Sequence, residues 1–324
     1  MSNVIGNTPM IKICYEYNGV RKHIYTKLEY FNLTGSIKDR VADRILRNAK
    51  KAGELKDGMK IVEATSGNTG ISVSAIGTRL GHEVCIFMPD WSSKERVELM
   101  KSYGATVILK SKEDGGFVEC VDASKRFAKE NKAFLVNQFS NIENFNAHYY
   151  GTAEEILNDV HEKISAFVSG VGTGGTLMGI GKRLKKECGN VDIIALEPDK
   201  MPIISTGKII SQHKIEGIGD DFVPDLVDKS AIDDIILIND DDAINMSRRL
   251  SKELGLGVGI SSGANLIAGV LANEKNSYDG AVVTVFADDN KKYLSTELSN
   301  GIDDNTSYES NKIKLIDYEV IQNM

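Results

Sequence analysis

The sequence predicts an α/β fold built from doubly wound, mostly parallel sheets. Two observations predict it. Short apolar runs rich in Val and Ile recur along the chain, and segments with helical periodicity separate them. Runs that are apolar throughout, rather than alternating, are typical of parallel strands covered on both faces. The length of 324 residues exceeds that of a typical single domain, so we expect one large or two medium domains.

The first elements expected along the chain are a hairpin and a helix. Asn18-Gly19 readily takes the left-handed conformations of a two-residue turn, and it separates apolar segments over residues 10–15 and 23–29. We therefore expect a hairpin on an antiparallel edge. A one-sided apolar stripe over residues 41–49 then predicts a helix that ends at Gly53. Buried strands, most of them parallel, are expected over residues 60–64, 84–88, 106–109, 133–136, 166–169, 193–196 and 281–286.

The chain carries no obvious linker between domains. Only five prolines occur, so no proline-rich segment divides the sequence. We expect an N-terminal domain over residues 1–147, of which residues of about 10–32 cross over to the sheet of the other domain, and a C-terminal domain over residues 148–300. Residues 301–324 begin with a stretch rich in Asp, Asn and Ser and are expected to form a polar tail outside the core.

Composition and charge restrict the class of partner. Hydrophobic residues make up 41% of the chain, which excludes intrinsic disorder for most of it. Acidic residues outnumber basic ones and give a net charge of −7, and no sustained Lys/Arg block occurs. The electrostatic footprint of a protein that binds nucleic acid or an anionic membrane is therefore missing. We expect a small-molecule partner.

A few sequence features bear on the compartment of the protein and on whether it binds a metal. Residues 254–273 are uncharged and as long as a bilayer span, but their five glycines predict a strand, a turn and the start of a helix instead. The first residues lack the features of a signal peptide, and the four cysteines are far apart. We expect reduced thiols and a cytoplasmic location. No paired-histidine or EF-hand motif occurs, so we predict no metal.

The segment Gly170–Gly175 is a Gly-x-Gly-x-x-Gly motif between an expected strand and a helix, with Glu197 about 22 residues further on. Taken alone it indicates a dinucleotide site, and an NAD-dependent oxidoreductase is one interpretation. Glycines that expose backbone N–H groups at a helix N-terminus bind any phosphate, however, so the motif specifies phosphate better than NAD. A glycine-rich turn without a ligand is the structural alternative.

A second motif, Gly259-x-Ser261-x-Gly263, matches the nucleophile elbow of serine hydrolases. That fold needs an acid and then a histidine after the serine, and the last histidine of this sequence is His213. The hydrolase interpretation therefore fails. A tight turn capped by serine hydroxyls and a ligand-binding role both remain open.

A third set of residues combines a lysine with a polar loop. Lys38 lies at an expected helix start, where the helix dipole disfavours a cation and makes the amine easier to deprotonate for imine chemistry. An ordinary surface lysine is the alternative. The segment Thr65–Gly70 places hydroxyl and amide side chains at another helix N-terminus, where they form either a nest for a carboxylate or an ordinary cap. With the glycine loop and Ser261, these are the parts that pyridoxal phosphate requires.

These motifs, in this order, resemble the cysteine synthase family, which comprises O-acetylserine sulfhydrylases and cystathionine β-synthases. The resemblance runs from residues 5–9 (Ile-Gly-Asn-Thr-Pro) to residues 292–295 (Lys-Tyr-Leu-Ser). It implies the tryptophan synthase β-subunit fold, called fold type II, with pyridoxal 5'-phosphate in a cleft between two domains. It also implies a homodimer.

The resemblance assigns a role to each motif. Lys38 resembles the lysine that binds the cofactor and later moves the α-proton. Asn68 resembles the residue that binds the phenolic oxygen of the cofactor, and Ser261 the partner of its pyridine nitrogen. The substrate carboxylate would be bound by Thr65, Ser66, Asn68 and Thr69, helped by Gln138. The phosphate would be bound by Gly172, Thr173, Gly174, Gly175 and Thr176.

The residue expected at the pyridine nitrogen bears on the reaction. A serine, unlike an aspartate, does not hold that nitrogen protonated, so the ring is a modest electron sink. Such a ring favours loss of a β-substituent together with the α-proton. The product is an aminoacrylate that a nucleophile attacks at the β-carbon. We therefore expect β-replacement on cysteine- or serine-type amino acids.

The chain departs from the sulfhydrylases at Gly217–Phe222, where Asp221 replaces a glycine, as in cystathionine β-synthases. A carboxylate there would repel hydrosulfide and could act as a base for water or a thiol. Our hypothesis is that the chain forms hydrogen sulfide from L-cysteine, yielding serine, lanthionine or cystathionine, with Asp221 as base. Three alternatives are a cysteine synthase acting on O-acetylserine and sulfide, a scaffold that binds the serine acetyltransferase tail, and a purely solvating role for Asp220 and Asp221.

Overall fold

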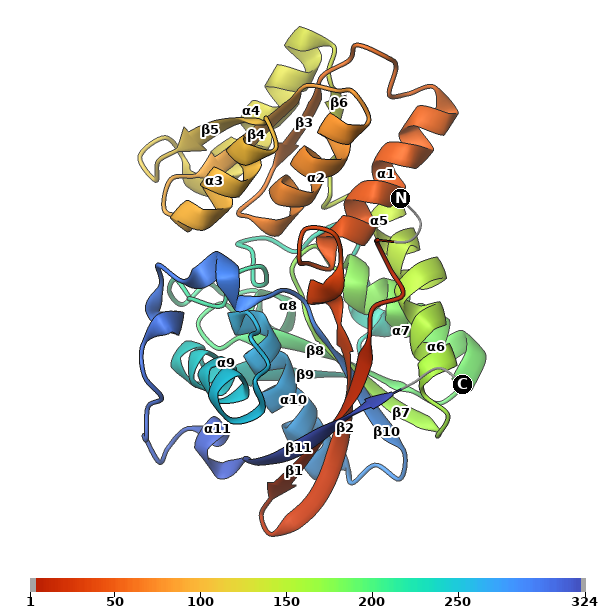
Figure 1. Ribbon diagram of the computed structural model, residues 1–324, viewed down its shortest axis with the longest axis vertical. Coiled ribbons are helices and arrows are strands. Elements are labelled where there is room, and N and C mark those ends of the chain that lie inside the picture. Colours follow the sequence, from red (N-terminus) through yellow and green to blue (C-terminus); the bar gives the residue numbers. More distant parts are fainter. Residues whose placement is uncertain (1–3, 322–324) are drawn as a thin grey trace.

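The computed structural model describes residues 4–321 as two α/β units that lie one above the other along the long axis (Figure 1). The smaller unit contains a four-stranded sheet and the larger a seven-stranded sheet. Over residues 4–321, no helix is both long enough and apolar enough to cross a membrane. The predicted α/β class is confirmed, because all strand pairs of the smaller sheet and most of those in the larger one are parallel.

The smaller unit is a doubly wound sheet. Its strands follow the order β5 (Thr106–Lys110), β4 (Val84–Pro89), β3 (Ile61–Ala64) and β6 (Phe134–Leu135). One face of the sheet packs against α1 (Lys38–Ala52), α2 (Asn68–Arg79) and α3 (Lys94–Ser102). The other face packs against α4 (Gly116–Asn131). Neighbouring residues of β3, such as Ile61 and Val62, point into opposite clusters and are both fully buried.

The larger sheet has the strand order β11-β1-β2-β10-β7-β8-β9. From β2 to β9 all neighbours are parallel, whereas β1 and β11 are antiparallel additions at one edge. The bounds are β1 Met10–Tyr17, β2 Val20–Leu28, β7 Ile164–Gly170, β8 Asp192–Pro198, β9 Asp234–Ile238, β10 Ala281–Phe286 and β11 Lys314–Ile321.

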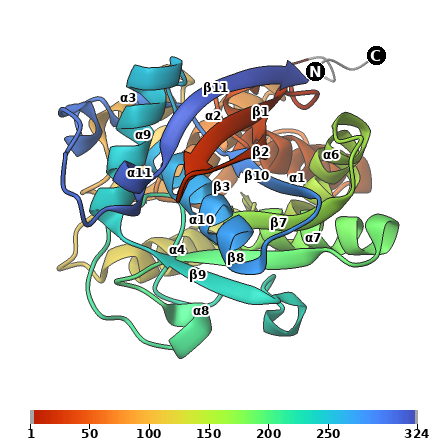
Figure 2. The same cartoon turned by 90° about the horizontal axis from the view of Figure 1, so that it is seen from below.

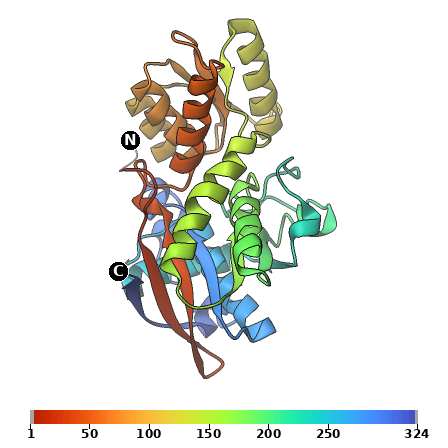
Figure 3. The same ribbon diagram turned by 90° about the vertical axis from the view of Figure 1, so that its right-hand side faces the viewer.

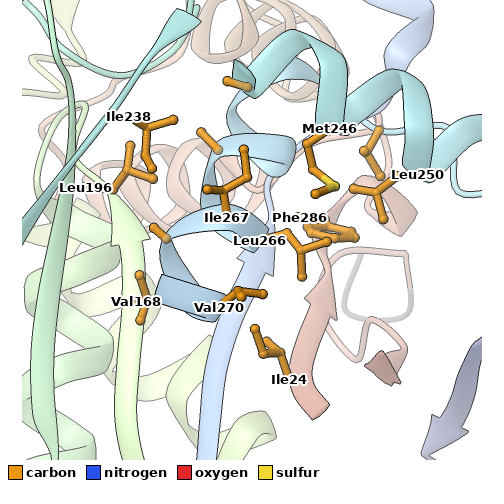
Figure 4. Packing of buried hydrophobic residues seen from close by; sticks show 14 of the residues in the cluster. Ile24, Val168, Leu196, Ile238, Met246, Leu250, Leu266, Ile267, Val270 and Phe286 are labelled. Atoms are coloured by element: carbon orange, nitrogen blue, oxygen red, sulfur yellow. The ribbon is translucent and has the colours of Figure 1, made fainter. Parts of the chain in front are cut away.

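Helices cover both faces of the larger sheet, as the view from below shows (Figure 2). One face packs against α9 (Asp240–Leu254) and α10 (Ile260–Asn276). In that cluster the aromatic ring of Phe286 lies among aliphatic side chains of α10, including Leu266 (Figure 4). The other face packs against α6 (Ala153–Asp159) and α7 (Gly175–Cys188).

Two segments connect the units. Helix α5 (Ile142–Ala147) contacts α1 as well as α7, and a short π-helical stretch at His148–Thr152 continues it into α6. Figure 3 shows this yellow-green segment running from the smaller unit along the larger one. The remaining short helices are α8 (Ile203–Thr206) and α11 (Glu309–Lys312).

The predicted hairpin is confirmed, and its place in the fold explains the domain organisation. Asn18 and Gly19 both have positive φ angles, 50° and 77°, as a two-residue turn between β1 and β2 requires. The hairpin belongs to the larger sheet, although the chain then builds the smaller unit from α1 to β6. The larger unit is therefore assembled from both ends of the chain.

The prediction for the C-terminal segment is wrong, because part of it joins the core. Strand β11 pairs with β1, and Ile313 and Leu315 are buried in the cluster beneath α9. Residues 322–324 lie outside the described residues. Strand β9 was not predicted, because its apolar run follows two aspartates and most of its side chains are only partly buried.

Candidate active site

The candidate site lies where the carboxyl ends of strands from both units meet. Strand β3 leads into Thr65, β6 into Gln138, β7 into Gly170 and β10 into Ala287, and residues of all four segments line one cavity. This is the place where open parallel sheets bind ligands. Most of the residues predicted for the site line this cavity, namely Lys38, Thr65, Ser66, Asn68, Thr69, Gln138, Gly172, Thr173, Gly174, Thr176 and Ser261. The two predicted residues that do not line it are Gly175 and Asp221.

Lys38 is the first residue of α1 and faces the cavity. The backbone before it is anchored to the larger unit, since the Ile37 N–H donates to the Ala287 carbonyl at 2.8 Å. Burial lowers the pKa of the Lys38 amine, and the negative charges of Asp220 and Asp288 oppose this effect. A buried amine with a lowered pKa is available as a nucleophile and as a base.

The segment from Thr65 to Thr69 closes the smaller unit's side of the cavity. The Thr65 hydroxyl accepts from the Gly67 N–H at 3.0 Å, and α2 begins at Asn68. The Thr69 hydroxyl donates to Gln138 Oε1 at 2.5 Å, while Gln138 Nε2 donates to the Ala64 carbonyl at 3.0 Å. These bonds hold Gln138 and a helix N-terminus at one cavity wall, where backbone N–H groups favour a carboxylate.

The glycine loop between β7 and α7 is packed too tightly for side chains. A Cβ on Gly172 would lie 2.4 Å from the Gly217 carbonyl oxygen, and one on Gly175 would lie 2.0 Å from Asn144 Oδ1. The Thr173 hydroxyl accepts from Asn144 Nδ2 at 2.8 Å. The N-terminus of the 14-residue helix α7 and the threonine hydroxyls therefore form an anion cradle. Gly175 does not line the cavity, but its lack of a side chain leaves room for Asn144 beside the cradle.

His148 lies behind the cradle. Its Nε2 is 3.3 Å from the Thr176 hydroxyl, and its Nδ1 is 3.0 Å from the Thr152 hydroxyl. Burial lowers the pKa of this histidine well below its usual value, so the ring is neutral. The single sequence contained no motif that indicated this residue.

Asn68 and Ser261 complete the cavity. Asn68 Nδ2 donates to Asp288 Oδ2 at 2.7 Å, whereas the buried Asn68 Oδ1 finds no hydrogen-bond partner within the described residues. Ser261 lies at the N-terminus of α10 and is 5% exposed. An orphaned amide oxygen, a buried amine, an anion cradle and a hydroxyl around one cavity fit the functional groups of pyridoxal 5'-phosphate.

The structure places Asp220, and not Asp221, beside Lys38. Asp220 lines the cavity, whereas Asp221 is exposed and lines only an outer pocket that opens from it. Neighbouring glycines with positive φ, Gly217 at 90° and Gly219 at 71°, set this turn, so the direction of each side chain could not be inferred from the sequence. Burial and the adjacent Asp221 raise the pKa of Asp220 to about 6, while Lys38 lowers it.

Arg96 and Glu216 were missed by the sequence analysis. Arg96, in α3, is 2% exposed and pairs with Glu216 of the larger unit, and both line the cavity. Its guanidinium carbon lies 4.5 Å from the ring centroid of Tyr293. These residues link the two units beside the ligand site. They belong to no short motif, because their partners are far away in the sequence.

Comparisons with known proteins agree with this site. Residues 1–288 match the model of the family described as "Pyridoxal-phosphate dependent enzyme". The chain is 38% identical to a cysteine synthase of Staphylococcus aureus over 299 residues, which cover 92% of this chain and 96% of the relative. A cysteine synthase structure from Entamoeba histolytica is 39% identical, with a TM-score of 0.88 and coverage of 95% of this chain and 93% of that one.

A further similar structure is that of a hydrogen sulfide-producing enzyme from Fusobacterium nucleatum. The two sequences are 48% identical, the TM-score is 0.95, and the match covers 99% of this chain and 97% of that one. The same enzyme has been solved as an aspartate-to-asparagine mutant in complex with an α-aminoacrylate intermediate.

Proposed function

The chain belongs to the family of pyridoxal-phosphate dependent enzymes, among the cysteine synthases, and from that premise we propose that it releases hydrogen sulfide from L-cysteine by β-replacement. One observation carries the proposal. The carboxyl group of Asp220 lines the same cavity as Lys38 and has a pKa raised to about 6. The similarity to a hydrogen sulfide-producing enzyme supports it.

The cofactor is pyridoxal 5'-phosphate, and the NAD interpretation of Gly170–Gly175 is wrong. When bound, this cofactor withdraws electrons from the α-carbon of an amino acid, so that the α-proton and the β-substituent can leave. We propose that its parts are bound by Lys38, Asn68, Ser261 and the cradle that ends at Thr176, and the position of these residues around one cavity supports this assignment.

Side chains of this protein bind the substrate and transfer the protons. The N-terminus of α2, with Thr69 and Gln138, binds and orients the carboxylate of L-cysteine. The Lys38 amine, whose pKa burial lowers, accepts the α-proton. Its position at the start of α1 keeps the nitrogen at the cavity wall throughout.

Asp220 acts on the incoming nucleophile. At neutral pH a carboxyl group with a pKa of about 6 is mostly ionised, so it can accept a proton from water or a thiol. With water, the C–S bond of L-cysteine breaks and a C–O bond forms. Sulfur leaves as hydrosulfide, and the water proton passes to Asp220 as the C–O bond forms. Lys38 returns the α-proton to the α-carbon, which gives L-serine. The proton on Asp220 passes to hydrosulfide or to solvent, so the net products are L-serine and hydrogen sulfide. With a thiol, a thioether such as lanthionine or cystathionine forms instead.

The same carboxylate disfavours the opposite direction, because it repels a hydrosulfide anion that approaches the β-carbon. A cysteine synthase that uses O-acetylserine and sulfide is nevertheless the second candidate. The identity of 38% with a cysteine synthase of Staphylococcus aureus favours it. The two candidate reactions differ, among the residues discussed here, in the role that they give to Asp220.

The test compares two neighbouring aspartates of that turn. Asp220→Asn keeps the shape of the side chain but removes the base, so we expect sulfide release from L-cysteine to fall at least about tenfold. Asp221→Asn is the matched control, because its side chain is exposed and outside the cavity. We expect it to change the rate less than about threefold, through the neighbouring charge. Equal rates for Asp220→Asn and the unmodified chain would refute the role of Asp220.

A further inference from the structure

Asp288 follows strand β10 and lies next to residues that line the cavity, although it does not line the cavity itself. It is 1% exposed, and its Oδ2 atom accepts two hydrogen bonds, from Asn68 Nδ2 at 2.7 Å and from the Tyr293 hydroxyl at 2.6 Å. The carboxylate thus contacts the amide that faces the cofactor and a fully buried phenol. No sequence motif and no role implied by the family resemblance involves this residue.

The surrounding backbone is built around this carboxylate. A Cβ on Gly259 would lie 2.0 Å from Asp288 Oδ1, so only glycine leaves room for it, and the Gly259 N–H donates to the Asp288 carbonyl at 3.0 Å. Asp288 also forms an isolated β-bridge with Ser36. The segments that carry Lys38, Asn68 and Ser261 therefore all meet at this one residue.

The charges around Asp288 give it an electrostatic role as well. Its negative charge and that of Asp220 raise the pKa of Lys38 against the effect of burial, while burial and the positive charge of Lys38 lower the pKa of His148. Burial keeps the pKa of Tyr293 well above its usual value, so the phenol stays protonated and remains a donor to Asp288.

We propose that Asp288 is a positioning residue, whose carboxylate fixes the amide of Asn68 toward the cofactor's phenolic oxygen and holds a negative charge beside Lys38. Because Asp288 Oδ2 accepts hydrogen bonds from Asn68 Nδ2 and the Tyr293 hydroxyl, the Nδ2 side of the amide is turned toward Asp288. That leaves the second N–H and the orphaned Oδ1 for the cavity. The proposal rests on the cofactor and not on which β-substituent leaves.

The test follows the visible absorption band of the cofactor in the purified holoenzyme, without substrate, over a range of pH. In Asp288→Asn the loss of a negative charge near the Lys38 nitrogen disfavours its cationic form, so we expect the pH midpoint of the band to fall by at least about 0.5 unit. We also expect the cofactor to dissociate at least about threefold faster. The control is Asp122→Asn, an exposed aspartate in α4, which leaves both quantities unchanged.

A second variant is expected to shift the pH midpoint of the band in the opposite direction. Tyr293→Phe removes one donor from Asp288 while leaving an aromatic ring beside Arg96, so the carboxylate charge is less neutralised and the midpoint should rise. If Asp288→Asn does not fold, Tyr293→Phe alone tests the proposal. A midpoint and a dissociation rate that match the unmodified protein in every folded variant would overturn the proposal. Neither readout depends on sulfide release, so failure here is distinguishable from failure of the proposed function.

Discussion

At the scale of single residues, the site depends on groups whose ionisation differs from that in water. Lys38 and His148 have lowered pKa values because they are buried, and Asp220 has a raised one for the same reason. Burial thus makes the amine a better base and leaves Asp220 with a pKa near the pH at which general bases act best. Such groups gathered around one cavity are typical of catalytic sites.

Glu63 is another buried carboxyl group, and it lies beneath Gln138, one of the residues that line the cavity. It accepts hydrogen bonds from the Ala64 N–H at 2.8 Å and the Gln138 N–H at 3.3 Å. Burial raises its pKa to about 8 despite these donors. Between its usual pKa and about 8, the folded state therefore holds a proton that the unfolded state releases, and the free energy of unfolding falls as pH rises through this window.

Glu63→Gln removes this titration. We expect the slope of the free energy of unfolding between pH 6 and 8, up to about 1.4 kcal/mol per pH unit from this group, to flatten in the variant. The slope is measured by urea unfolding at several pH values. Glu83→Gln, an exposed glutamate just before β4, is the matched control and should keep the original slope. Parallel slopes for Glu63→Gln and the unmodified chain would show that Glu63 does not titrate in this window.

At the scale of elements, helix N-termini organise the site. Helices α1, α2, α7 and α10 all begin at the cavity, with Lys38, Asn68, Gly175 and Ser261 in their first turns. Helix N-termini at α2, α7 and α10 favour anionic or polar groups in the cavity. At α1 the same dipole disfavours a protonated lysine, which supports the proposed role of the amine as a base.

The cradle at α7 provides a test at this scale. In Gly175→Ala the new Cβ would overlap Asn144 Oδ1, so Asn144 must move and release the Thr173 hydroxyl. We expect the dissociation constant for pyridoxal 5'-phosphate, measured by absorbance titration, to rise at least about tenfold, equivalent to about 1.4 kcal/mol. Gly301→Ala, where a Cβ meets nothing within 4 Å, serves as control. Equal affinity in both variants would contradict the packing argument.

At the scale of the whole molecule, the two units are tied together at the mouth of the site. Arg96 pairs with Glu216, Glu95 accepts from the Ser295 N–H at 2.7 Å, and the Ser93 hydroxyl donates to the Lys292 carbonyl at 2.8 Å. All three contacts join α3 or its N-cap residue Ser93 to segments of the larger unit. The substrate therefore enters between units whose separation these contacts set.

The pair between the units predicts a kinetic effect. Glu216→Gln leaves the buried Arg96 without its carboxylate, which weakens the contact between the units beside the cavity. We expect KM for L-cysteine to rise at least about fivefold with a smaller change in kcat, as measured by steady-state sulfide release. Glu297→Gln, at the outer pocket and far more exposed, is the control. A fall in kcat alone, with KM unchanged, would contradict a role of this pair in shaping the substrate site between the units.

The sequence was sufficient for the fold class and for most of the site, because both depend on local patterns. Apolar runs predicted the parallel strands, Asn18-Gly19 predicted the hairpin, and the motifs around Lys38, Asn68 and Gly172 marked loops that converge on one cavity. The family resemblance then gave the cofactor. Homodimer formation and binding of the serine acetyltransferase tail stay predictions.

The remaining features depend on contacts between distant segments. Arg96, Asp288 and His148 each have a partner more than 25 residues away, namely Glu216, Asn68 and Thr176, and one sequence does not reveal such contacts. The choice between Asp220 and Asp221 depends on the backbone of a turn with two positive-φ glycines. Strand β11 pairs with β1, an edge strand from the other end of the chain, and the sequence near β11 gives no sign of this pairing. The polar residues before β11 therefore led to the wrong prediction of a tail outside the core.

The most direct test of the central claim is to incubate the purified holoenzyme with L-cysteine in water enriched in oxygen-18. Sulfide and the amino-acid product would be measured together. We expect steady sulfide release with L-serine carrying the label, and a thioether in place of serine when a thiol is added. Absence of sulfide release from L-cysteine, together with rapid L-cysteine formation from O-acetylserine and sulfide, would contradict it.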